Sequence, residues 1–440
     1  MSFIRNSILT LLGTVGRVLF SMVSQIIISR VLGPVGKGLY AFLVQIPTVL
    51  VPMSSLGLSY ANTYYVAKDH ECGRKAVGSS TVVAALLGTL MAGAVGIAYL
   101  FLHQTYMSEV SVGQLWLMMI SIPFALVNLY WLGVLWGLDR IGKYNIALLV
   151  QYVVMAGGAL LLTLGQWLTV TTGLGIWMAG NVLTTVYMLP DMLRISQGRL
   201  FHFDRRYVKS ATGYSLKSYI YNVMNVINYR LGLFIVTGFT AMDQVGLYAT
   251  AVTLAEMVNY VGNSVNTALI PKLASGTDQL TFDQTPKISR ITVFITVIIA
   301  IGLAALGYPL IILFFSKAFA GSYYPLLLML PGIIALAAST VISGDLMARG
   351  KPSYTSISSA VGVVVTVLLN LILVPLWGIA GAAIASSAVY MVIFGVNFSF
   401  YHKESGRSLL SVLILTRADV QDIGRIIGRM LASRGRKGGR

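Results

Sequence analysis

Long hydrophobic runs, separated by short polar segments, recur along the whole of this chain. A membrane-spanning helix needs about 20 predominantly apolar residues. The first run carries Arg17 inside it and leads directly into the next, so it is counted as a span rather than a cleaved signal peptide. The pattern predicts an all-α, polytopic membrane protein of twelve helices, at 8–29, 38–64, 79–102, 113–136, 144–166, 168–189, 211–238, 245–270, 288–316, 324–345, 354–374 and 379–401.

An internal repeat relates the two halves of the chain. The tetrapeptide at 38–41, Gly-Leu-Tyr-Ala, recurs at 246–249, and Gly142-Lys143 recurs as Gly350-Lys351 at the same offset of 208 residues. Because each half holds six spans, both halves enter the membrane from the same side, which predicts a parallel pseudo-two-fold repeat. The expected domains are a six-helix lobe at 1–190, a basic cytoplasmic linker at 191–210, a second six-helix lobe at 211–402 and a cytoplasmic tail at 403–440.

Composition and charge place this protein in a membrane. Hydrophobic residues make up 56% of the chain and charged residues 10%, against about 25% charged residues in soluble proteins. The net charge of +17 does not indicate a nucleic-acid partner, because Lys and Arg follow membrane topology. Sixteen of them fall in the N-terminus and cytoplasmic loops, and three in outside loops (Arg30, Lys37 and Lys317). We expect a multi-pass protein of the cytoplasmic (inner) membrane with both termini in the cytoplasm.

The C-terminal tail shows a separate hydrophobic pattern. Its apolar residues recur at helical spacing, with Arg425 and Arg429 off that stripe, which favours a basic amphipathic helix on an anionic lipid surface. The alternative is a tail that merely follows the positive-inside rule. The stripe consists of Val420, Ile423, Ile427, Met430 and Leu431.

Polar residues inside spans are costly and are therefore candidates for function. On the first span they share one helix face, at Thr14, Arg17, Ser21 and Ser24, and on the second at Gln45, Thr48, Pro52, Ser55 and Ser59. The repeat offset maps these faces onto the seventh span, at Asn222, Asn225, Tyr229 and Gly232, and the eighth, at Thr253, Glu256, Tyr260, Asn263 and Thr267. We expect these four spans to line a water-filled cavity; the alternative is polar contacts between packed helices.

The charges on these faces predict an anionic substrate. Arg17, Lys217 and Arg230 are cationic, and an arginine can bind a phosphate through two hydrogen bonds. The alternative for Arg17 is a snorkelling or salt-bridged structural residue. Glu256 is a candidate either for ion coupling or for balancing a cavity cation. The candidate substrate-binding residues are Arg17, Lys217, Arg230, Asn225, Gln45 and Asn263.

Signatures of enzymes and cofactors are missing from the sequence. The four histidines have no zinc-type spacing, and Gly350-Lys351 lacks the phosphate-loop pattern. The single cysteine, Cys72, excludes an intrachain disulfide and a cysteine metal cluster. We therefore expect no catalytic residues, no metal and no cofactor.

Short motifs recur at helix starts in both halves of the chain. They are Arg30-Val31-Leu32-Gly33-Pro34, then Gly38-Leu39-Tyr40, Val245-Gly246-Leu247-Tyr248-Ala249 and Gly378-Ile379-Ala380-Gly381-Ala382-Ala383. With these motifs the chain resembles the polysaccharide-transporter and O-antigen flippases, a family of the superfamily that also holds multidrug MATE exporters and lipid II flippases. The resemblance implies two six-helix lobes around a cavity lined by the first, second, seventh and eighth helices. It also implies export of undecaprenyl-pyrophosphate-linked oligosaccharides to the outer leaflet, with other polysaccharide-assembly membrane proteins as partners.

Two other classes of protein are alternatives. A MATE-type multidrug cation antiporter would share the architecture but would be expected to hold unpaired carboxylates in its cavity. A membrane-embedded polymerase or glycosyltransferase would need a paired carboxylate site or a large outside loop. The cavity predicted here is net positive, and the predicted outside loops are short.

Overall fold

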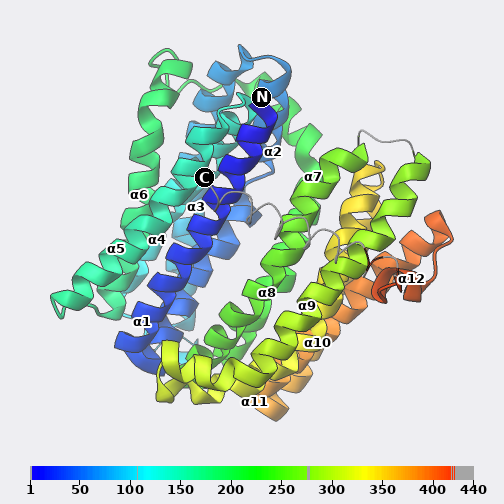
Figure 1. The fold of residues 1–440 in the computed structure, drawn as a ribbon. Helices are drawn as coiled ribbons and strands as arrows, with labels where there is room; N and C mark the ends of the chain where they lie inside the picture. The colour runs from blue at the N-terminus through cyan, green and yellow to red at the C-terminus, as the bar shows by residue number, and fades with distance from the viewer. Residues whose placement is uncertain (1, 107, 275–277, 418, 420, 422–440) are drawn as a thin grey trace, which may run out of the picture. The chain divides into compact units, whose positions relative to one another are not determined.

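The structure is a computed structural model, which describes the backbone of residues 2–106, 108–274, 278–417, 419 and 421. Within these ranges the chain is helical and contains no strand (Figure 1). The helices are α1 (Ser2–Ser54), α2 (Leu58–Lys68), α3 (Cys72–Tyr106), α4 (Val112–Gly137), α5 (Ile141–Leu164), α6 (Val170–Ile195), α7 (Arg205–Phe239), α8 (Met242–Ala274), α9 (Asp278–Phe314), the 3-10 helix η1 (Lys317–Ser322), α10 (Tyr323–Ala348), α11 (Pro352–Ser405) and α12 (Leu409–Leu413).

Two of these helices are divided into two arms by a glycine. Gly33 in α1 and Gly378 in α11 have φ angles of 66° and 56°, outside the helical region. Glycine adopts positive φ without a steric cost, so it can redirect the chain there. With both helices divided and α2 counted with the second arm of α1, the described residues supply twelve membrane-length segments. The all-α fold that the hydrophobic pattern predicts is confirmed.

Length and apolar composition alone single out seven helices, within the described residues, as able to cross a membrane. They are α1, α3, α4, α5, α9, α10 and α11, two of which contain two arms each. The helix α7 is long enough, with 35 residues, but its Tyr, Asn and basic residues dilute its apolar surface. Polar faces of this kind are what the sequence predicts for a cavity helix.

The chain forms two compact units. The first contains residues 1–250, 309–322 and 370–382, and the second contains the remainder. The helix α8 therefore begins in the first unit and continues in the second. The lobe boundaries expected from the repeat stay a prediction.

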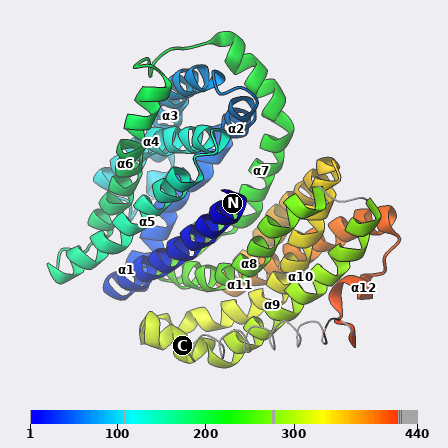
Figure 2. The same ribbon diagram turned by 45° about the horizontal axis from the view of Figure 1, so that its top comes forward.

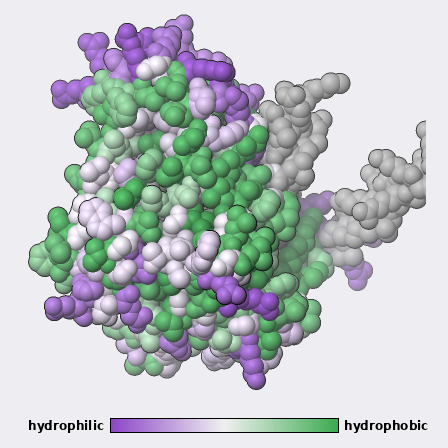
Figure 3. Space-filling view, turned by 90° about the vertical axis from the view of Figure 1, so that its left-hand side faces the viewer, coloured by the Kyte–Doolittle hydropathy of each residue, from purple (hydrophilic) through white to green (hydrophobic). Residues whose placement is uncertain are grey.

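The core of the first unit is built around α4. Its Met118, Ile122 and Leu126 are fully buried, and α4 packs against α2, α3 and α6. By contrast, Leu90 of α3 and Leu161 of α5 are 61% and 70% exposed, which fits side chains that face lipid. On the face drawn in Figure 3, hydrophobic residues form a broad area and hydrophilic residues gather toward its ends.

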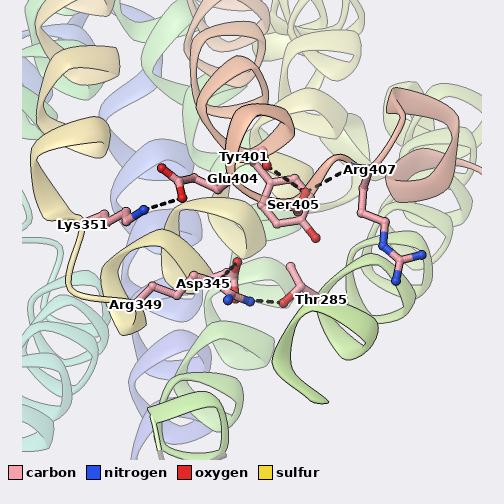
Figure 4. Close-up of polar contacts among 8 residues, drawn as sticks. All are labelled: Thr285, Asp345, Arg349, Lys351, Tyr401, Glu404, Ser405 and Arg407. Carbon is pink, nitrogen blue, oxygen red and sulfur yellow. Dashed lines mark hydrogen bonds and ion pairs between the residues drawn. The ribbon is translucent and has the colours of Figure 1, made fainter. Parts of the chain in front are cut away.

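An ion pair at the repeat-related lysine occurs in each half of the chain. In the first unit, Lys143 pairs with Asp191 near the end of α6, and Arg140 contacts the same carboxylate at 2.9 Å. In the second unit, Lys351 pairs with Glu404 at the end of α11 (Figure 4). Lys143 thus ties the start of α5 to the end of α6, and Lys351 ties the start of the first arm of α11 to the end of its second arm. The matched dipeptides therefore mark equivalent structural points.

The second unit holds a further buried ion pair at the same end of its helices. Arg349 contacts both oxygens of Asp345, at 2.8 and 2.9 Å, and the Thr285 hydroxyl donates a hydrogen bond of 3.1 Å to this carboxylate (Figure 4). Asp345 is fully buried. A buried carboxylate needs such partners, so this aspartate joins α9 to α10.

The beginning of the tail is fixed to α9. The Arg290 guanidinium donates hydrogen bonds of 2.6 and 3.0 Å to the two carboxylate oxygens of Asp419 and one of 2.6 Å to the Ser411 carbonyl. Arg290 holds the pKa of the Asp419 carboxyl well below its usual range. The stabilisation is therefore present above the ordinary pKa of an aspartate and is lost only as the pH falls through the lowered value. The predicted amphipathic stripe, from Val420 to Leu431, lies outside the described residues.

A lysine expected in an outside loop is instead buried. The chain does not leave the helix between the first two predicted spans; it turns at Gly33 and continues as the second arm of α1. Lys37 consequently lies one turn into that arm, is 2% exposed and donates a hydrogen bond to the Gln25 side chain. The outside-loop placement of Lys37 is therefore wrong, because the predicted loop is helical.

The two repeat-related glycines pack against each other. A Cβ added at Gly38 would lie 1.9 Å from the backbone oxygen of Met242, and one at Gly246 would lie 2.0 Å from that of Pro34. Met242 follows Pro34 by the same 208 residues that separate Gly246 from Gly38. Each glycine therefore contacts the equivalent backbone carbonyl in the other half of the repeat. Only residues without a Cβ permit two backbones to approach this closely.

Candidate functional site

The candidate site includes a break in the second predicted span. The sequence predicts one helix over 38–64, but α1 ends at Ser54 and α2 begins at Leu58. Pro52 lies just before the break, and Leu56 and Gly57 have positive φ angles of 49° and 70°. Because proline has no backbone N–H and the helix stops, several carbonyl groups lose their intrahelical partners. Broken spanning helices occur in membranes where other groups satisfy these carbonyls.

Hydroxyl groups from two neighbouring helices satisfy the carbonyls at the break. On α7, the Ser215 hydroxyl donates a hydrogen bond of 3.2 Å to the Leu56 carbonyl, and the Tyr219 hydroxyl donates one to the Met53 carbonyl. On α4, the Tyr130 hydroxyl donates a hydrogen bond of 3.0 Å to the Ser55 carbonyl. The broken segment is thus held against α7, which also runs beside α2 (Figures 1 and 2).

Arg17 lies on the first arm of α1, and one nitrogen of its guanidinium makes no hydrogen bond within the described residues. The side chain is half-buried, and its Nη2 donates a hydrogen bond of 2.9 Å to the Thr14 hydroxyl. Its Nε is buried and has no hydrogen-bond partner among the described residues. A buried donor without a partner is costly, so this guanidinium can bind an additional acceptor.

One tyrosine interacts with this arginine, and two further tyrosines interact in turn with that tyrosine or with each other. Arg17 interacts electrostatically with Tyr144 of α5. Tyr60 of α2 interacts with both Tyr144 and Tyr221 of α7, and the Tyr221 hydroxyl is hydrogen-bonded to the Asn225 side chain. We call these five residues, from α1, α2, α5 and α7, the Arg17 cluster. It combines one cation with three hydroxyl groups and one amide, which suits an anionic, hydrogen-bonding ligand.

The other predicted site residues occupy different places. Gln45 is buried, and its side-chain amide donates a hydrogen bond of 3.1 Å to the Arg230 backbone carbonyl, which joins α1 to α7. The Arg230 side chain is half-buried. Glu256 is half-buried and lies in the second unit. Lys217 and Asn263 lie within α7 and α8, but their side chains are outside the described set.

Sequence reasoning missed two tyrosines of the cluster, Tyr60 and Tyr144. The third, Tyr221, lies four residues before the predicted candidate Asn225 on α7. A signal was present in the composition, because tyrosines outnumber phenylalanines by 23 to 17. It was also present in the spacing, because Tyr60 and Tyr64 stand one turn apart on α2.

Solved structures with a similar arrangement of helices define the class of fold. A lipid II flippase, MurJ, in an inward closed conformation shares a TM-score of 0.70 with this chain at 15% identity, covering 90% of this chain and 87% of MurJ. An inward-facing multidrug resistance MATE family transporter of the MOP superfamily has a TM-score of 0.72 at 15% identity, covering 89% of this chain and 94% of that transporter. This chain shares the helical fold of these two structures, as the sequence predicts.

Sequence comparison identifies the family. Residues 3–276, more than half of the chain, match the family described as Polysaccharide biosynthesis protein, and this chain belongs to that family. A putative O-antigen transporter from Shigella flexneri is 24% identical over 400 residues, which cover 88% of this chain and 94% of the relative. A probable low-salt glycan biosynthesis flippase, Agl15, from Haloferax volcanii is 22% identical over 299 residues; these cover 64% of this chain and 61% of that flippase.

Proposed function

We propose that this protein is a flippase that moves lipid-linked oligosaccharides from the cytoplasmic to the outer leaflet for cell-surface polysaccharide synthesis. The observation that carries the proposal is the Arg17 guanidinium, which lies well inside α1 with a buried Nε that has no hydrogen-bond partner among the described residues. Such a cation is costly in a membrane unless it pairs with an anion. The carrier is proposed to be undecaprenyl pyrophosphate, whose phosphates match arginine.

The physical task of such a flippase is to replace water around the headgroup. Stripping water from a charged pyrophosphate costs many kcal/mol in hydrocarbon. Fixed donors in the Arg17 cluster offset that cost, while the prenyl tail stays in lipid. Rocking of two lobes then exposes the headgroup to one side at a time. An inside-negative potential favours outward movement of an anion by about 2.3 kcal/mol per charge per 100 mV.

Further cavity residues complete the proposed site. Lys217 and Arg230 are proposed to add positive charge, and Asn225, Gln45 and Asn263 to contribute polar groups. Gln45 acts here at least partly through its hydrogen bond to the α7 backbone. This positive balance favours an anionic lipid over the cationic drugs of a multidrug antiporter. The proposed activity is transport and requires no catalytic residue or cofactor.

Removal of the protein from its native cells tests this function. Lipid-linked oligosaccharides should then accumulate on the cytoplasmic leaflet, where added glycosidases in inside-out vesicles can reach them. Restoring the gene should return them to the outer leaflet. Unchanged distribution between the leaflets would contradict the proposal.

We predict that the C-terminus is cytoplasmic, because sixteen basic residues fall in the N-terminus and predicted cytoplasmic loops, against only Arg30 and Lys317 in predicted outside loops once Lys37 is set aside. A reporter enzyme that is active only in the periplasm, fused after Arg440, should stay inactive. The matched control places the same reporter after Lys317, in a predicted outside loop, where it should be active. Strong activity after Arg440 would reverse the proposed orientation.

Glu256 distinguishes two ways of driving transport. We propose that it balances a cavity arginine, because cations outnumber carboxylates on the predicted polar faces. Glu256→Gln should then lower stability, since removing one partner leaves a buried cation uncompensated. Transport by protein in liposomes should follow voltage but not a proton or sodium gradient imposed at fixed voltage. A gradient-dependent rate that is lost in Glu256→Gln would instead make this residue the coupling site.

A further inference from the structure

A pair of stacked tyrosines lies where α2 and α7 meet. The rings of Tyr64 and Tyr214 have centroids 4.1 Å apart and planes inclined by 18°. Their side chains are 40% and 49% exposed. Neither hydroxyl is hydrogen-bonded to another group in the described parts of the chain. The pair therefore presents ring surface and two available hydroxyls to its surroundings.

Two further tyrosines hold this pair in place. Tyr65 contacts Tyr214 edge-on at 5.8 Å and Tyr207 at 6.0 Å. The buried Tyr207 donates a hydrogen bond of 2.8 Å to the Asn62 side chain, and Asn62 in turn donates one of 2.8 Å to the Ser80 hydroxyl. The stacked rings are thus supported by a hydrogen-bonded layer beneath them, so their orientation is fixed before any ligand binds.

The stacked pair is continuous with the Arg17 cluster. Tyr64 follows Tyr60 by four residues on α2, and Tyr214 precedes Tyr221 by seven residues on α7. Residues at these spacings share a helix face. The two helices therefore carry a row of tyrosines that runs from the end of α2 toward Arg17.

Tyrosine rings in this arrangement match the surface of a sugar. The apolar face of an aromatic ring packs against the C–H face of a pyranose, and the phenolic hydroxyl exchanges hydrogen bonds with sugar hydroxyls. Neither feature recognises a prenyl chain or a phosphate specifically. Arginine, by contrast, binds phosphate. Tyrosines and an arginine together therefore recognise different parts of a glycosylated carrier lipid.

We propose that Tyr64 and Tyr214 form a glycan-binding platform that receives the sugar units while the Arg17 cluster binds the pyrophosphate. This inference rests on the proposed flippase function and adds a separate subsite for the oligosaccharide. The platform favours carriers that already bear sugars over the bare carrier lipid.

Binding to the purified full-length protein in detergent separates the two subsites. The probes are undecaprenyl pyrophosphate and the glycosylated lipid extracted from native cells that lack this protein. Wild-type protein should bind the glycosylated probe at least about tenfold more tightly, the order expected for two aromatic contacts. The double variant Tyr64→Leu/Tyr214→Leu should lose this preference and bind the bare carrier as before. Arg17→Ala should weaken binding of both probes.

Two further variants control for structure. Tyr64→Phe/Tyr214→Phe keeps the rings and should retain most of the preference. Tyr324→Leu removes a 61% exposed tyrosine at the start of α10 and should change nothing. Two results would overturn the platform while leaving the flippase proposal intact. In one, the leucine double variant keeps the full preference for the glycosylated probe. In the other, it binds both probes more weakly by the same factor. Failure of the wild-type protein to bind either probe would overturn the proposed function itself.

Discussion

Replacement of Arg17 by alanine should abolish transport while leaving the protein inserted and folded. Among the described residues, the guanidinium donates one hydrogen bond, to Thr14 within its own helix, and its buried Nε has no partner, so its loss removes little from the fold. Loss of a phosphate contact in a desolvated site should cost about 2–5 kcal/mol. The measurement is complementation of surface polysaccharide in cells that lack the native gene, with membrane abundance determined in parallel.

Two matched variants separate charge from geometry at this position. Arg17→Lys keeps the charge but lacks the planar fork that binds two phosphate oxygens, so it should transport at a reduced rate. Arg199→Ala removes an exposed arginine after α6 and should complement fully. Full complementation by Arg17→Ala at normal abundance would assign Arg17 a structural role only.

The contact between Gly38 and Gly246 should be the most sensitive steric point of the fold. A methyl group at Gly38 would lie 1.9 Å from the Met242 backbone oxygen, well inside contact distance, so the backbones must separate. Overpacking of this kind costs about 1–3 kcal/mol, or more where the backbone cannot move. We expect Gly38→Ala and Gly246→Ala each to lower the thermal unfolding midpoint of the purified protein and to reduce transport.

The reciprocal contact between Gly38 and Gly246 leads to a second prediction. Both variants disrupt one and the same contact, so the double variant should cost less than the sum of the two single variants. Gly93→Ala is the control, because a Cβ at Gly93 in α3 meets nothing within 4 Å and alanine favours a helix. Unfolding midpoints equal to wild type in Gly38→Ala, Gly246→Ala and the double variant would show that this close approach does not exist.

The all-helical membrane fold could be predicted from sequence because long apolar runs recur along the chain. The repeat at an offset of 208 residues also anticipated real structure, since Lys143 and Lys351 make equivalent ion pairs and Gly38 meets Gly246. The prediction was wrong at the connection between the first two spans. The segment around Gly33 reads as a polar turn but is helical on both sides, which buries Lys37.

The candidate site could be predicted only in part. Arg17 and Asn225 were found because a polar residue inside a span is unusual in itself. Tyr60 and Tyr144 were missed because tyrosine is also common in cores and at membrane interfaces, so the contacts between helices had to be known. The helix break after Ser54 was hidden as well, since proline within a spanning helix produces a kink more often than an end.

Transport by the purified protein in liposomes tests the central claim most directly. Glycosylated carrier lipid, extracted from cells that lack this protein, is placed in the vesicle membrane, and a glycosidase outside the vesicles reports the sugars in the outer leaflet. The account predicts that wild-type protein makes the whole lipid pool accessible, that an interior-negative voltage speeds outward movement, and that Arg17→Ala vesicles expose no more than protein-free ones. Equal exposure in protein-free, wild-type and Arg17→Ala vesicles would contradict it.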